Sequence, residues 1–256
     1  QGDTMTSLDA YVERMPASQE EVYYLVAPGG RKQAEASPYL EAARARGYEV
    51  LFLYAHVDEF VMQHVRKHKG KDLVSAEAAT FEAETSDADT ESEEDVDGGG
   101  SSAALSPARM SSLCDWFATE ALPGRVTGVS TSARLTSTPA LLVGHEPEAM
   151  RRYRAMLTMM SDEATAAKLD ELRNAAALEL NPKHAVIKGI ERLRREAGEN
   201  GENGEKARIA KLLAEQVFDN ARVAAGALDD PREMVGRIHE ILEIALERFD
   251  ESPPPE

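Results

Sequence analysis

A long acidic stretch without any basic residue divides this chain and limits how it can fold. Ten carboxylic acids and no lysine or arginine lie between Glu77 and Asp97, and the sequence Gly-Gly-Gly-Ser-Ser follows directly. Such a segment holds too few apolar side chains to offset the conformational entropy that it would lose on ordering. We therefore predict a disordered loop between two folded parts. The predicted segments are a first module at 1–76, the acidic loop at 77–104, a second domain at 105–250 and a flexible tail at 251–256.

The composition excludes several classes of protein. The formal net charge of −17 repels a phosphate backbone, and no apolar run approaches the roughly 20 residues of a membrane span, so we expect neither nucleic acid nor a membrane as partner. The single cysteine, Cys114, excludes a disulfide framework and a cysteine-built zinc site, and we expect no metal site. Because the chain opens at Gln1 rather than at methionine, we expect it to be a fragment of a longer protein.

Two apolar, β-branched and aromatic runs dominate the first module. Residues 21–27 and 49–54 have the pattern of strands that are covered on both faces. Between them, Pro38 stands at a helix start and Gly47 at a helix end, so the region is a predicted β-α-β unit.

Two further elements complete this module. Asp58 is expected to cap another helix, and residues 70–75 are expected to return as a short edge strand. The sequence therefore predicts a small three-layer α/β module.

The second domain is predicted to be mostly helical with a short sheet. Four helix starts in the chain share a small polar residue followed by proline, and three of them belong to this domain: Ser37-Pro38, Ser106-Pro107, Asn181-Pro182 and Asp230-Pro231. Residues 125–134 and 139–143 are predicted to form a hairpin or two neighbouring strands, with Pro139 placing the second at an edge.

A methionine-rich helix is predicted after Pro147. Methionine is flexible and polarisable, so a stripe of it is typical of an adaptable binding surface, although ordinary core packing gives the same spacing. The candidate binding residues are Met150, Tyr153, Met156, Leu157 and Met160.

The last two helices are predicted to form a hairpin with two apolar seams. So much aliphatic surface at a chain end needs a partner, either the rest of the domain or a second copy that completes a four-helix bundle. The candidate interface residues are Ile209, Leu212, Leu213, Val217, Ala224, Met234, Val235, Ile238, Ile241, Leu242 and Ala245.

No constellation of catalytic residues emerges, so we predict no catalytic residue, no bound cofactor and no enzyme activity for this chain. The turn at 28–32 follows the first strand, where phosphate binds in many α/β folds, but it lacks a glycine-rich phosphate fingerprint. A phosphate-binding α/β enzyme domain therefore stays as an alternative, as does a passive dimeric scaffold.

Several ordered segments of the two folded parts carry a family resemblance. They are 6–11, 23–25, 37–41, 47–51, 58–59 and 70–75 in the first, and 132–135, Pro139 and 178–188 in the second. The first group resembles the end of the middle domain of the heat shock protein 90 chaperones. The second group resembles the C-terminal dimerisation domain of that family, and residues 24–28 and 224–237 look most like its mitochondrial type.

The resemblance implies a role as the dimerisation and client-binding part of an ATP-dependent chaperone. ATP and Mg would bind in parts of the parent protein that this chain does not contain, and the parent would be the ATPase. The implied partners are a second copy, unfolded client proteins and co-chaperones. The implied location is the mitochondrial matrix, with the cytoplasm as the alternative.

Overall fold

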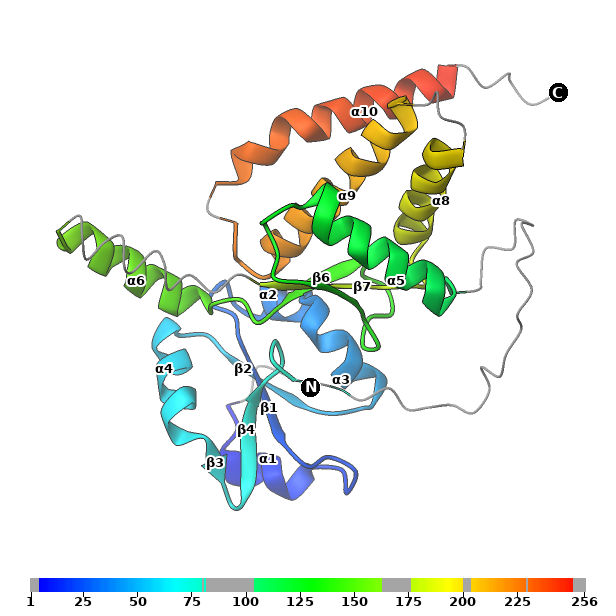
Figure 1. Cartoon of the computed structure of the whole chain (residues 1–256). Coiled ribbons are helices and arrows are strands. Elements are labelled where there is room, and N and C mark those ends of the chain that lie inside the picture. Colours follow the sequence, from blue (N-terminus) through cyan, green and yellow to red (C-terminus); the bar gives the residue numbers. More distant parts are fainter. Residues whose placement is uncertain are drawn as a thin grey trace. The chain divides into compact units, whose positions relative to one another are not determined.

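The computed structural model describes residues 5–79, 81, 104–162, 176–199, 204–228 and 230–250. Two compact units divide the chain, and each takes residues from separate stretches (Figure 1). Among the described residues, unit 1 holds those within Gln1–Glu93, Ala133–Ser137 and Glu146–Asn174. Unit 2 holds those within Glu94–Ser132, Thr138–His145 and Ala175–Glu256.

A four-stranded sheet with the order β2-β1-β4-β3 forms the centre of unit 1. The central strand β1 (Val22–Val26) is parallel to both β2 (Val50–Leu53) and β4 (Lys71–Ser75), and the two-residue β3 (Lys67–His68) runs antiparallel to β4. The predicted strands therefore exist. The prediction that the last of them lies at an edge is wrong, because β3 turns back and pairs with its outer side.

Helices cover both faces of this sheet. Tyr23 points to one face, where it packs with α3, whereas Val22 and Tyr24 point to the other and pack with α1 and α4. The α/β prediction is confirmed for this unit. Its helices are α1 (Leu8–Arg14), α2 (Arg31–Glu35), the 3₁₀ turn η1 (Pro38–Leu40), α3 (Glu41–Ala45), α4 (His56–Val65) and α6 (Glu148–Met160).

Asp58 is not the cap residue of α4. It is the third residue of the helix, and its carboxylate accepts a hydrogen bond from the N–H of Ala55 at 3.1 Å. The side chain therefore reaches back to the residue before the helix instead of opening it.

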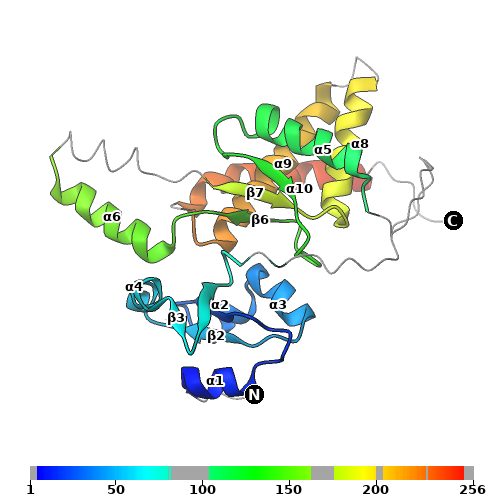
Figure 2. The same cartoon turned by 60° about the horizontal axis from the view of Figure 1, so that its bottom comes forward.

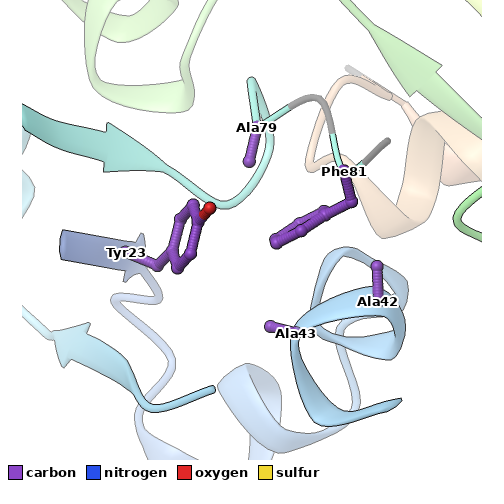
Figure 3. Close-up of a cluster of buried hydrophobic side chains, with 5 residues drawn as sticks. All are labelled: Tyr23, Ala42, Ala43, Ala79 and Phe81. Atoms are coloured by element: carbon purple, nitrogen blue, oxygen red, sulfur yellow. The ribbon is translucent and has the colours of Figure 1, made fainter. Parts of the chain in front are cut away.

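Aromatic rings fill the core on the α3 side of the sheet. The rings of Tyr23 and Phe81 lie with centroids 5.0 Å apart and are tilted by 46°, and Ala42, Ala43 and Ala79 belong to the same cluster (Figure 3). The alanines allow α3 to approach the sheet closely, because they add little bulk between the helix and the rings.

Unit 2 contains a three-stranded sheet with the order β5-β7-β6. The middle strand β7 (Ala177–Leu180) is parallel to β5 (Val129–Thr131) and antiparallel to β6 (Ala140–Val143). The predicted pairing of the first two strands with each other is wrong, because a segment far along the chain inserts between them. The edge position of β6 after Pro139 is as predicted.

The helices of unit 2 pack on this sheet and on one another. They are α5 (Pro107–Trp116), the π-helical turn η2 (Phe117–Ala121), α8 (Ala185–Glu199), α9 (Gly204–Ala224), the 3₁₀ turn η3 (Pro231–Met234) and α10 (Val235–Asp250). Helix α9 contacts β6, α5 contacts β5, and α8 and α10 both contact α9. In the described part of the chain, none of the helices has the length and apolar character needed to cross a membrane.

The proline signals mark helix starts in three of four cases. Pro107 opens α5, Pro38 opens η1 and Pro231 opens η3, where Asp230 accepts from the N–H of Arg232 at 3.0 Å. The fourth signal, Pro182, lies in a turn, and α8 begins only at Ala185.

Candidate functional site

Helix α6 belongs to unit 1, where it packs against α4; the two helices lie next to each other in both cartoon views (Figures 1 and 2). The ring of Tyr153 meets the ring of Phe60 edge-on, with centroids 6.2 Å apart. Nη1 of Arg152 lies 3.1 Å from Nε2 of His56. These contacts join α6 to α4.

Several large apolar side chains of α6 are exposed. Met159 is 88% exposed, Met160 78%, Met156 50% and Tyr153 49%. Exposed apolar side chains gathered on one helix are typical of a protein-interaction site, because contact with water is unfavourable for them. Met150 and Leu157, the other two candidates, are half-buried.

Met159 is the most exposed of the large apolar side chains described in this helix, and it was not among the predicted binding residues. The helical spacing could have identified it, because position 159 lies three residues after Met156 and is therefore its neighbour on the helix surface. The apolar side chains Tyr153, Met156, Met159 and Met160 are called the α6 surface below.

The α9–η3–α10 hairpin of unit 2 contains the residues predicted to form a dimer interface. Some of them are buried and others are uncovered. Ile209, Val217 and Met234 are buried within the unit, so a second copy does not reach them without rearrangement. The half-buried members are Leu212, Leu213, Ile238 and Ile241, and the exposed members are Ala224, Val235, Leu242 and Ala245.

One uncovered line of apolar side chains runs along α10. Val235, Leu242 and Leu246 are exposed, and their spacing of seven and four residues places them on one side of the helix. Leu246 was absent from the predicted interface although it is 66% exposed. These three side chains are called the α10 surface below.

A buried carboxylate joins α9 to α10. The side chain of Asp219 is 3% exposed and accepts from Arg125 at 2.9 Å, Arg222 at 3.2 Å and Arg237 at 2.7 Å. Arg125 also lies over the ring of Phe218, 4.6 Å from its centroid. Because the three arginines come from a loop and both helices, this one carboxylate holds together three parts of unit 2.

The turn after β1 uses its own polar groups. The N–H of Gly29 donates to Oε1 of Gln33 at 2.7 Å, and the N–H of Gly30 donates to the carbonyl of Ala27 at 2.9 Å. Arg31 pairs with Glu35 at 2.6 Å. Donors that a phosphate would need are therefore already engaged, and α2 is only five residues long.

Neither the cysteine nor the acidic and histidine side chains of the described region form a reactive centre. Cys114 is buried, and burial raises the pKa of its thiol, which disfavours the nucleophilic thiolate. Among the described residues, no three His, Cys, Asp or Glu side chains come together in a way that could hold a metal ion.

Comparison with protein families identifies the family of this chain. The model of the family described as "Hsp90 protein" matches residues 1–256. This chain belongs to the Hsp90 family. The family-level resemblance of the sequence is therefore confirmed.

Individual members of the Hsp90 family match most of the chain. It is 36% identical over 245 residues to "Heat shock protein 75 kDa, mitochondrial" of Bos taurus, which covers 95% of this chain and 32% of that protein. It is 35% identical to "Chaperone protein HtpG" of Desulfitobacterium hafniense, covering 94% and 35%. It is 32% identical to "TNF receptor-associated protein 1 homolog, mitochondrial" of Dictyostelium discoideum, covering 94% and 30%. The chain thus spans about a third of the length of these relatives.

The segment that carried much of the Hsp90 resemblance has a structural role in unit 2. Asn181 is fully buried; its Nδ2 donates to the carbonyl of Thr138 at 3.0 Å, and its Oδ1 accepts from the N–H of Lys183 at 3.0 Å. Its own N–H donates to the carbonyl of Pro139 at 2.8 Å. Asn181 therefore ties the end of β7 to the start of β6 and shapes the following turn.

Proposed function

We propose that this chain is the dimerisation and client-binding part of an ATP-dependent Hsp90 chaperone. In this proposal, residues 1–76 are the end of the middle domain, 105–250 form the C-terminal dimerisation domain, and the segments 77–104 and 251–256 are a spacer and a tail. The observation that carries the proposal is a pair of uncovered apolar surfaces, one on α6 and one on α10, in a chain of this family. The name of one relative, "Chaperone protein HtpG", supports it.

The α10 surface is the proposed contact between two copies. Each copy would contribute α9 and α10 to a four-helix bundle, and each buried leucine would add about 2 kcal/mol to association. In a symmetric dimer both copies contribute the same residues to the interface. Val235, Leu242 and Leu246 therefore supply six apolar side chains in total. Half-buried Ile238 and Ile241 lie on the flank of this surface and would add to it.

The α6 surface is the proposed contact with unfolded clients. Thioether side chains adapt to apolar partners of many shapes, which suits binding without sequence preference. Two copies joined at α10 would present two such surfaces at a high effective concentration to one client.

The ATPase of the parent belongs to the same proposal. ATP and Mg would bind in domains of the parent outside this chain, which itself would bind no cofactor and catalyse no reaction. The names of two relatives place those proteins in mitochondria, and we infer a mitochondrial location, in the matrix, for this one, with the cytoplasm as the alternative. Co-chaperones are further proposed partners.

The oligomeric state tests the dimer proposal directly. We expect light scattering at micromolar concentration to give about twice the 27.9 kDa of one chain. The double variant Leu242→Glu, Leu246→Glu should give a monomer, since four charges would enter one apolar interface. Val61→Glu, at a comparably exposed valine of unit 1, is the control and should remain a dimer. This interface would be refuted if the unsubstituted chain were a monomer. It would also be refuted if the double variant remained a dimer.

A further inference from the structure

The methionines of this chain range from buried, through half-buried, to almost fully exposed. Met159 is 88% exposed and Met160 78%, whereas Met110 is 2% exposed and Met234 9%. Met156 at 50% extends the exposed group along α6. A sulfur atom in contact with water meets dissolved oxidants, while a sulfur in a close-packed core does not.

We propose that the α6 surface is a reversible methionine-oxidation site, with Met156, Met159 and Met160 as the modified residues. The oxidant is hydrogen peroxide. The thioether sulfur attacks one peroxide oxygen, a sulfur–oxygen bond forms as the oxygen–oxygen bond breaks, and the second oxygen leaves as water after taking up the proton of the transferred oxygen. Sulfur loses two electrons to the peroxide. Methionine sulfoxide reductases return the thioether with two electrons from a dithiol, which becomes a disulfide, and the sulfoxide oxygen leaves as water.

Oxidation changes the physical character of this surface more than that of any other described part of the chain. Three of its four large apolar side chains are thioethers, and a sulfoxide is polar where the thioether is apolar. The sulfoxide oxygen retains its water when an apolar partner approaches, so contact with the partner loses its driving force. The consequence for clients rests on the proposed function: oxidised α6 releases or refuses apolar segments, and reduction restores binding.

The chain itself offers a matched control for exposure. Met5 is 97% exposed but lies outside α6, near the start of the described residues. It should oxidise as readily as Met159, and its oxidation should leave client binding unchanged.

Peptide mass spectrometry of the whole chain after graded hydrogen peroxide treatment tests the site. We expect sulfoxide at Met5, Met159 and Met160 to form about tenfold faster than at Met110 and Met234. Equal rates at the exposed and buried methionines of the folded chain would overturn the proposal.

Suppression of aggregation of heat-denatured malate dehydrogenase tests the consequence. The unsubstituted chain should no longer suppress aggregation after peroxide treatment. It should suppress aggregation again after treatment with the A and B types of methionine sulfoxide reductase. The triple variant Met156→Leu, Met159→Leu, Met160→Leu stays apolar and helical and should keep suppression after peroxide. The Met5→Leu variant should lose its suppression of aggregation after peroxide treatment, as the unsubstituted chain does.

The two readouts separate failure of this inference from failure of the client role. If the unsubstituted chain still suppresses aggregation when Met156, Met159 and Met160 are sulfoxides, the proposed effect of oxidation on client binding is wrong. If untreated Met156→Glu, Met160→Glu suppresses aggregation like the parent chain, the client role of α6 is wrong. In that case, fast sulfoxide formation at Met159 and Met160 still supports the modification site.

Discussion

Nη1 of Arg237 on α10 lies 2.7 Å from the carboxylate of Asp219 on α9, in a setting where Asp219 is almost fully buried. Nε of Arg237 also lies 3.6 Å from Glu215, one helical turn before Asp219. The ion pair between Arg208 and Glu240 joins the same two helices farther along. These pairs fix the rotation of α10 about its axis, and this rotation decides that Val235, Leu242 and Leu246 face outward.

Removal of the buried carboxylate should destabilise unit 2. Asp219→Ala leaves Arg125, Arg222 and Arg237 without their shared partner, and breaking a buried ion pair costs about 3–5 kcal/mol. Fluorescence of Trp116 during urea unfolding measures this, because the only tryptophan of the chain lies in unit 2. Arg232→Ala removes the exposed pair with Asp230 and is the control, with little change expected. Equal midpoints for the two variants would contradict the structural role of Asp219.

Truncation of Asn181 should weaken the junction between β7 and β6. Asn181→Ala loses two partly buried side-chain hydrogen bonds, to the carbonyl of Thr138 and from the N–H of Lys183, which costs about 1–3 kcal/mol. Fluorescence of Trp116 during urea unfolding measures this loss of stability. Asn220→Ala removes the exposed amide that accepts from Gln216 and should change the midpoint far less. A smaller effect at 181 than at 220 would show that the junction does not depend on this side chain.

Charge on the α6 surface should abolish client binding without unfolding the chain. Met156→Glu, Met160→Glu places two carboxylates where apolar contacts are proposed, and we expect affinity for an unfolded protein to fall by about tenfold or more. Both side chains are exposed, so circular dichroism should remain that of the parent chain. Met5→Glu is the control at an exposed methionine elsewhere. A passive scaffold would show no difference among the three proteins.

The stability of unit 1 should fall at alkaline pH. Burial raises the pKa of Tyr23 and of Tyr24 to about 12 from the ordinary value of 10.0, with further contributions from Glu21 and from Glu59, respectively. Because the folded-state pKa exceeds the unfolded one, this contribution to stability is complete below pH 10 and is lost as the pH rises through about 12.

Tyrosine signals suit this measurement, because all seven tyrosines lie in unit 1. Near-ultraviolet circular dichroism should therefore report urea midpoints of unit 1 that decrease with rising pH. Tyr24→Phe removes one titrating hydroxyl, so its midpoint should decline less steeply than that of the parent chain. Parallel curves for the two proteins would exclude Tyr24 as a cause of the decline.

Local sequence patterns predicted most of the elements that form the two sheets. The apolar runs at 21–27 and 49–54 became β1 and β2, since a strand buried on both faces needs a continuous apolar sequence. Pro107 and Pro231 marked helix starts because proline fixes the backbone angle that a first helical turn requires. Such rules work because they involve only neighbouring residues.

The arrangement of these elements depended on contacts that no local pattern contains. The short run at 177–180 was used only as part of a family motif, yet it forms the central strand between β5 and β6. The methionine-rich helix follows the acidic segment and was predicted to belong to the second domain, whereas it packs on α4 of unit 1. In both cases the partner lies far away along the chain, and pairing is decided by which surfaces fit.

The sequence by itself determined that this chain belongs to the Hsp90 family, that it is α/β and helical in its two parts, and that α6 and the last two helices carry excess apolar side chains. Only the tertiary structure decided which of those side chains remain uncovered. Ile209, Val217 and Met234 turned inward, whereas Leu242, Leu246, Met159 and Met160 stayed in contact with water. The periodicity of a helix defines its apolar face, but burial depends on what packs against that face, and here Asp219 and its arginines set the rotation of α10.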